Sequence, residues 1–136
     1  MDFDQFLGQV QNRARLASSG EALRTARAVL TTLGERLPEG EATDLAGPLP
    51  MEIDRFLTEE PESHAQRFGF DEFVARVVER ERMSEDDRAD AAYHAQLVVD
   101  VVSDVAPPGE MEDVRASLPE EYDRLFELAE ADEDAG

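Results

Sequence analysis

The sequence contains no lysine, no cysteine and no tryptophan. Without cysteine the chain can form no disulfide bond, thiolate nucleophile or zinc site with sulfur ligands. No apolar run approaches the ~18 residues of a membrane span, so we expect no membrane association. The first residues lack a basic segment followed by an apolar one, so we predict that the chain has no signal peptide. We therefore expect a cytoplasmic protein.

The charge balance is strongly one-sided. All 13 basic residues are arginines, against 33 aspartates and glutamates, and the formal net charge is −20. At ~1 M salt the Debye length is about 3 Å, so repulsion among surface carboxylates is screened, whereas in dilute buffer it would loosen the fold. We therefore expect monovalent salt as a solvent requirement and a halophilic archaeal source. An acidic mesophilic protein that lacks lysine through genomic bias is the alternative.

The arrangement of the arginines argues against nucleic acid as a partner. Binding to phosphates needs clustered basic side chains. Here the arginines are dispersed along the chain and mostly flanked by acids, as in VERERMSEDDR. Anionic membranes are disfavoured for the same reason.

The two halves of the chain resemble each other. FDQFLGQV (Phe3–Val10) recurs as FDEFVARV (Phe70–Val77), and GEATDLAGPLPMEIDRFL (Gly40–Leu57) recurs as GEMEDVRASLPEEYDRLF (Gly109–Phe126). Such self-similarity indicates an internal duplication. We predict one all-helical domain over residues 1–126, with repeat one at 3–57, a linker at 58–68 and repeat two at 70–126. Residues 127–136 are predicted to be an acidic disordered tail.

Hydrophobic periodicity predicts that each repeat is helical. Phe3, Phe6, Leu7 and Val10 follow the i, i+3, i+4, i+7 spacing of one helix face, and the matching residues of repeat two do the same. Long helices are predicted to follow the polar starts at Ser18 and Ser84. The VVDVV stretch at 98–102 lies within the second of these, despite its strand propensity. A short helix and a final helix then complete each repeat.

The predicted architecture is therefore a compact all-α bundle of two pseudo-symmetric four-helix repeats. The phenylalanines of both first helices are expected to be core residues. Of the two histidines, His64 in the acidic linker is expected to be solvated, and His94 is expected to be a partly exposed structural residue.

The repeated Gly-Glu-x-x-Asp … Leu-Pro-x-x-x-Asp-Arg block provides the best candidate site. Around a pseudo-twofold cleft, the two copies could form one binding cluster. Its residues would be Asp44, Asp54, Arg55, Asp113, Asp123 and Arg124. The alternative is purely structural: the acids favour helix N-termini or pair with arginine, and Leu-Pro sets a turn.

No catalytic or cofactor motif accompanies this block. The serines show no Gly-x-Ser-x-Gly elbow, and no phosphate loop or dinucleotide fingerprint occurs. The helical di-metal pattern Glu-x-x-His is missing, and DDRAD at 86–90 lacks the glycine and terminal glutamate of a calcium loop. We therefore predict no catalytic residues, no metal ligands and no cofactor.

Several segments carry a family resemblance. FDEFVARVVERE, GEMEDVRASLPEEYDRLF and the stretch from FLGQVQ to AGPLP resemble the domain-of-unknown-function family 2267, with GERLPEGEA and EDVRASLPEEY as the most specific parts. The resemblance implies a small all-helical protein with duplicated halves. It implies no activity and no functional residues.

Two functional hypotheses follow. The first is a non-enzymatic module that binds a protein partner, since a folded helical chain without catalytic motifs fits that role. The second is a regulatory domain that binds a small molecule or metal ion in the cleft between the repeats. An enzyme ranks third, and the partner and the oligomeric state stay open.

Overall fold

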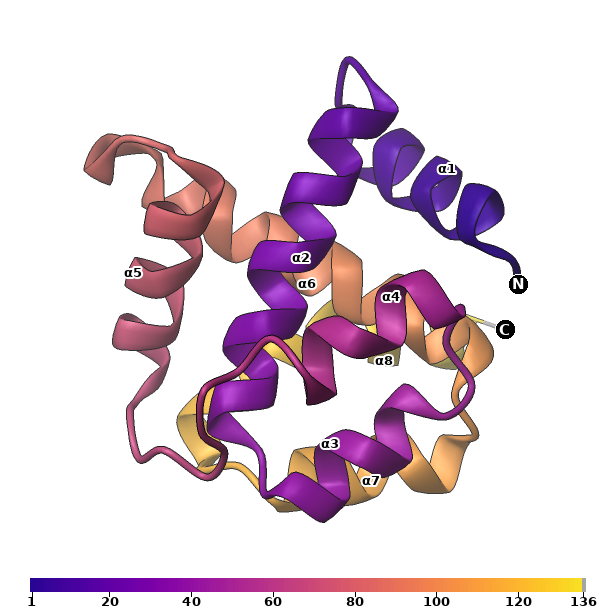
Figure 1. Ribbon diagram of the computed structural model, residues 1–136, viewed down its shortest axis with the longest axis vertical. Helices are drawn as coiled ribbons and strands as arrows, with labels where there is room; N and C mark the ends of the chain where they lie inside the picture. Colours follow the sequence, from indigo (N-terminus) through magenta and orange to yellow (C-terminus); the bar gives the residue numbers. More distant parts are fainter. Residues whose placement is uncertain (136) are drawn as a thin grey trace.

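The computed structural model describes residues 1–135, with side chains for residues 1–131 (Figure 1). Every regular element in this part of the chain is a helix, which confirms the all-α prediction. Repeat one contains α1 (Phe3–Ala14), α2 (Ser19–Arg36), α3 (Glu39–Ala46) and α4 (Met51–Thr58). The rest of the chain contains α5 (Phe70–Glu81), the 3₁₀ helix η1 (Glu85–Asp87), α6 (Arg88–Val105), α7 (Pro108–Ala116), the 3₁₀ helix η2 (Glu120–Phe126) and α8 (Glu127–Ala135).

Local side-chain contacts explain where the helices begin. Asp2 and Gln5 form a reciprocal capping box at the start of α1. Ser18 accepts a hydrogen bond from the backbone N–H of Glu21 and caps α2, while the Glu21 carboxylate reaches back to the N–H of Ala17. These bonds satisfy N–H groups that the first turn leaves without partners. The starts of both helices could therefore be predicted from short polar patterns.

The two long helices, α2 and α6, form the centre of the molecule and contact each other. Their predicted apolar stripes are buried, and VVDVV is helical as expected. Phe6, Phe70 and Phe73 are also buried, so the first helices of both repeats supply core residues. Phe70 and Phe73 both lie edge-on to the buried ring of Tyr122 from η2.

Contacts between the halves involve corresponding elements. The first helix of each repeat packs on the long helix of the other, α1 on α6 and α5 on α2. The short helices α3 and α7 pack against each other, side by side in Figure 1. An internal twofold would produce these contacts, and the pseudo-symmetry itself stays a prediction.

Residues after 126 differ from expectation. Where the sequence predicted a disordered tail, residues 127–135 form α8, which packs against α6 and η2. The acidic composition suggested a solvated segment, but Arg115 on α7 forms an ion pair with Glu130. The final helix of repeat two is also a 3₁₀ helix, whereas its counterpart α4 is an α-helix.

The linker is more ordered than a solvated loop. Its backbone N–H groups at Ala65 and Gln66 donate to the carbonyl oxygens of Leu37 and Glu35, each at 2.9 Å. His64 is half-buried, and its Nδ1 lies 2.8 Å from the carbonyl oxygen of Gly34, so the prediction that it is solvated is wrong. These bonds hold the linker along the C-terminal half of α2.

No helix in the described part of the chain combines the length and the apolar character needed to cross a bilayer.

Candidate functional site

The structure brings together part of the predicted cluster. Because α3 packs on α7, Asp44 and Glu41 of repeat one lie next to the corresponding acids Asp113 and Glu110 of repeat two. Carboxylate oxygens of Glu41, Asp44 and Glu110 all lie within 4.8 Å of one another. We call Glu41, Asp44, Glu110 and Asp113 the acidic cluster.

Burial and mutual repulsion both act on the acidic cluster. Partial burial raises the pKa of Glu41 and of Glu110 above its ordinary value, and the neighbouring carboxylates raise it further. The Oε1 atom of Glu110 is buried and has no hydrogen-bond partner in the described part of the chain. Oxygen ligands of this kind suit Mg²⁺ or Ca²⁺. Protonation or salt screening would relieve the same repulsion, so the cluster by itself does not identify a metal site.

Asp44→Asn should stabilise the fold by about 0.5 kcal/mol in about 0.2 M KCl. The substitution removes one charge from the acidic cluster and from the last turn of α3, where the helix dipole disfavours acids. In about 2 M KCl the gain should shrink, since salt screens the repulsion. Thermal unfolding in both buffers measures the effect. Glu112→Gln on the exposed side of α7 is the control, and an equal gain there would contradict the explanation.

Three of the other predicted site residues have partners elsewhere. Arg55 lies 3.6 Å from Glu59 on the next turn, and Asp123 accepts from Arg115 at 3.2 Å. The guanidinium of Arg124 lies 5.1 Å from the centre of the Phe70 ring. Asp54 is half-buried on α4. The structure therefore places Arg55, Asp123 and Arg124 against partners outside the predicted six, and a common site for all six residues stays a prediction.

A larger hollow lies where the two repeats meet along α2 and α5. This inter-repeat groove has a volume of about 730 Å³. Helix α2, the linker and the C-terminal end of α5 line it, through Gly20, Leu23, Arg24, Arg27, Ala28, Thr31, Glu35, Glu60, Glu62, Arg80 and Arg82. Its lining contains four arginines and three glutamates, so the groove carries a small net positive charge, whereas the whole chain has a net charge of −20.

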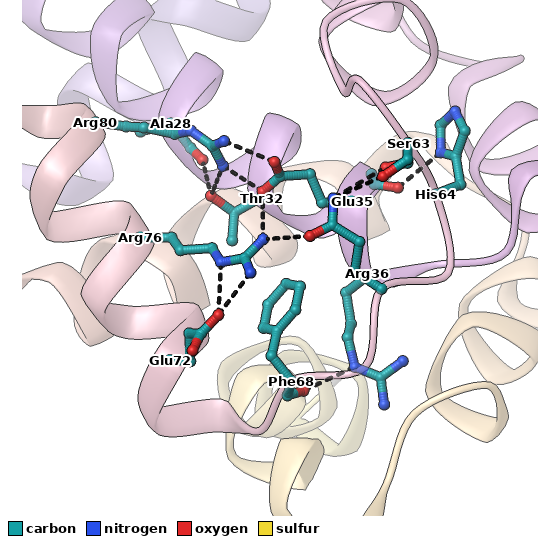
Figure 2. A network of polar contacts seen from close by, with 12 residues as sticks. Ala28, Thr32, Glu35, Arg36, Ser63, His64, Phe68, Glu72, Arg76 and Arg80 are labelled. Atoms are coloured by element: carbon teal, nitrogen blue, oxygen red, sulfur yellow. Dashed lines mark hydrogen bonds and ion pairs between the residues drawn. The ribbon is translucent and has the colours of Figure 1, made fainter.

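A buried carboxylate organises one wall of the inter-repeat groove. Glu35 on α2 is 8% exposed. Arg80 on α5 donates two hydrogen bonds to its carboxylate, at 2.6 and 2.8 Å (Figure 2). Arg76, one turn earlier on α5, donates to the same carboxylate at 3.1 Å. Burial by itself would raise the pKa of Glu35, but the bonds and charges of Arg80 and Arg76 outweigh it and hold this pKa below the ordinary value. The network joins repeat one to repeat two.

The remaining arginines of the inter-repeat groove have fewer hydrogen-bond and ion-pair partners. Arg27 forms an ion pair of 3.0 Å with Glu60 of the linker. Arg24 and Arg82 are exposed, and neither has a hydrogen-bond or ion-pair partner among the described residues. Two guanidiniums are therefore available to a ligand in the groove.

Thr31 adds a neutral polar group to the same wall. The residue is 8% exposed, and its Oγ1 is buried without a hydrogen-bond partner in the part of the chain described here. Its neighbour Thr32 donates to the carbonyl oxygen of Ala28 at 2.8 Å, as threonines in helices commonly do. A buried hydroxyl without a partner costs about 1–3 kcal/mol. Thr31 therefore lowers the stability of the ligand-free protein.

A second polar network links α5 to α2 and α6. The buried Glu81 accepts a hydrogen bond from Thr25 on α2 at 2.6 Å and lies 3.0 Å from Nδ1 of His94 on α6. The hydrogen bond to Glu81 raises the pKa of His94 above its ordinary value, against the opposing effect of burial. His94 is thus partly exposed, as predicted, and its structural role stays a prediction.

Sequence reasoning missed the inter-repeat groove and its buried carboxylate. One signal was present: Thr25, Ala28, Thr32 and Glu35 recur at helical spacing beside the main apolar stripe of α2. Such a stripe of small and polar residues indicates a second packed face. Nothing in the pattern indicated that α5 would cover it.

Comparison with protein families identifies the chain. The model of the family described as "Uncharacterized conserved protein (DUF2267)" matches residues 3–125. The chain therefore belongs to this family, as the resemblance implied. No curated protein matches the chain.

Proposed function

We propose that this member of the DUF2267 family is a non-enzymatic binding domain that holds a small anionic molecule in the inter-repeat groove. The proposal rests on one observation: four of the 13 arginines gather around a single groove of a strongly acidic chain. Arg24 and Arg82 lack partners there among the described residues. An anion bridging them would supply the charge-assisted hydrogen bonds that both guanidiniums favour.

The dimensions of the inter-repeat groove fit a small molecule. Ligand pockets typically enclose about 300–1,000 Å³ and combine apolar walls with a few polar groups. The groove has about 730 Å³, and Leu23 and Ala28 contribute apolar surface next to the arginines. Glu35, Arg76 and Arg80 hold the two walls together, so the site is organised before a ligand arrives.

A protein partner has less support from the surface. Docking sites for proteins usually present a contiguous apolar patch. The large apolar residues that are exposed in the described structure are Met1, Met51 and Tyr93, and they belong to the N-terminus, α4 and α6. A protein-interaction role stays a prediction, and we place the groove before it.

A binding experiment with two simple anions tests the proposal. Citrate and phenyl phosphate are each titrated into the protein at constant ionic strength, and thermal unfolding is followed. An anion present at about 100 times its Kd stabilises the folded state by about 2.7 kcal/mol, which corresponds to several degrees in Tm. We expect at least one of the two anions to produce this rise.

Charge-matched double variants locate the effect. Arg24→Ala with Arg82→Ala should abolish the rise. Arg15→Ala with Arg67→Ala is the control, since both side chains lie outside the inter-repeat groove and have no ion-pair partner in the described structure. The control also matches the backbone, because Arg15 and Arg82 both adopt positive φ at the end of a helix. Failure of both anions in the wild type, or equal responses in the two double variants, would overturn the proposal.

A further inference from the structure

The inter-repeat groove contains donors of two kinds, and their arrangement restricts the chemistry of the anion. Arg24 lies on the α2 wall and Arg82 follows the last turn of α5, so the two free guanidiniums come from opposite walls. A carboxylate is planar, and the fork of one arginine can satisfy both of its oxygens. A tetrahedral phosphoryl group carries three terminal oxygens and can accept from two walls at once.

The number of free cations favours a doubly charged group. Arg24 and Arg82 both lack a hydrogen-bond or ion-pair partner among the described residues, whereas Arg27 pairs with Glu60 and lies over the Phe56 ring. A phosphate monoester carries close to two negative charges near neutral pH, because its second pKa is about 6. A carboxylate or a sulfate ester carries one. The dianion is therefore the better electrostatic match.

The buried hydroxyl of Thr31 gives an independent reason to expect a ligand. Its Oγ1 has no hydrogen-bond partner in the described structure, although Thr31 lines the inter-repeat groove and is 8% exposed. An unsatisfied buried donor is uncommon and requires an explanation. A phosphoryl oxygen in the groove would be an acceptor for it.

The carboxylates around the inter-repeat groove limit the length of the anion. Glu35, Glu60 and Glu62 line it beside the arginines and would repel the repeated phosphates of a nucleic acid. Leu23 and Ala28 offer apolar contact to the organic part of a small ester. A single phosphoryl group on a compact organic body fits both features.

We infer that the inter-repeat groove binds a phosphate monoester, with Arg24 and Arg82 on its phosphoryl oxygens and Thr31 as a neutral donor. This inference rests on the proposed function and names the chemical class of its ligand.

Three probes that share an aromatic body test the inference. Phenyl phosphate, phenyl sulfate and phenylacetate are titrated by calorimetry at the same ionic strength and pH 7.5. Phenyl phosphate should bind at least about tenfold more tightly than the other two, since it alone is a dianion. Between pH 7.5 and 5.5 its affinity should fall as it gains a proton, and the affinity of phenyl sulfate, which reports titration of the protein, should stay constant.

Thr31→Val separates ligand binding from folding. Valine keeps the shape but lacks the hydroxyl, so the ligand-free variant should unfold at a higher temperature than the wild type, while its affinity for phenyl phosphate should fall severalfold. Thr43→Val is the control, because the Thr43 hydroxyl donates to its own helix on the exposed side of α3. A Thr31→Val variant that binds phenyl phosphate as tightly as the wild type would overturn the role of Thr31.

The outcomes distinguish the inference from the proposed function. Equal affinity for the three probes, with loss of all binding in the Arg24→Ala, Arg82→Ala variant, would leave an anion site and overturn the phosphate assignment. If no probe and no citrate binds, the proposed function fails as well. Tighter binding of a single-stranded oligonucleotide than of phenyl phosphate would overturn the inference in favour of a nucleic-acid ligand.

Discussion

Gly34→Ala is expected to destabilise the protein by about 3 kcal/mol, although alanine is the better helix former. Gly34 lies inside α2, where α4 and the linker approach most closely. A Cβ atom at this position would lie 2.4 Å from the carbonyl oxygen of Leu57 and 2.8 Å from Cγ of Pro61. The carbonyl belongs to the backbone of α4, so relief of the clash requires the helices to move apart.

Gly8→Ala provides the matched control. Gly8 also lies inside a helix, α1, but a Cβ atom there would have no neighbour within 4 Å. Alanine should therefore stabilise the fold by about 0.5–1 kcal/mol through helix propensity. Urea unfolding of both variants measures the two effects. A Gly34→Ala protein as stable as the wild type would contradict the close packing of α2, α4 and the linker.

Gly34→Ala should also affect the inter-repeat groove. The carbonyl oxygen of Gly34 lies 2.8 Å from Nδ1 of His64, and the linker that this contact positions carries Glu60 and Glu62 into the groove. A displaced linker would separate Glu60 from Arg27. The tight glycine contact thus connects the packing of repeat one to the geometry of the site.

Glu35→Gln should destabilise the protein by about 2 kcal/mol at neutral pH. The substitution keeps the shape of the side chain but leaves Arg76 and Arg80 facing a neutral amide in a partly buried place. Removal of one partner from a buried ion pair is costly because the other charge stays desolvated. Glu72→Gln is the control: Glu72 is 54% exposed and pairs with the same Arg76, so its loss should change stability by less than about 1 kcal/mol.

The effect of Glu35 should depend on pH in a defined direction. Its pKa in the folded protein lies below the ordinary value of 4.5, so the ionised carboxylate favours the folded state. The difference in stability between wild type and Glu35→Gln should be complete at pH 7, begin to shrink as the pH falls below about 4.5, and vanish below the pKa of the folded state. A difference that grows on acidification would contradict the assigned ion pairs.

Helices and core could be predicted from the sequence because their signals are local. The spacing of Phe3, Phe6, Leu7 and Val10 defines an apolar face without knowledge of what covers it, and the last three of these residues are buried. The same holds for the VVDVV stretch, where the long helical stripe outweighed strand propensity. At the C-terminus, the acids that suggested disorder belong to a helix packed on α6, and no local pattern indicated this packing.

The candidate site was predictable only in part. Repetition of the Gly-Glu-x-x-Asp pattern placed Asp44 and Asp113 in one candidate cluster, and both lie near Glu41 because the corresponding short helices pack together. Arg55 and Arg124 belong to the same candidate cluster, but their long side chains reach partners on a neighbouring turn or on another helix. A repeat pattern specifies backbone positions, whereas rotamers depend on the tertiary surroundings.

By itself, the sequence determined that the chain is helical and strongly acidic and predicted an internal repeat, because periodicity and composition act residue by residue along the backbone. The inter-repeat groove was decided only by tertiary structure. Arg24 and Arg82 lie in different predicted repeats. From its sequence neighbours, each is expected to be a dispersed, solvated charge. They line the same groove because α5 packs on α2, and that packing depends on contacts between residues far apart in the chain.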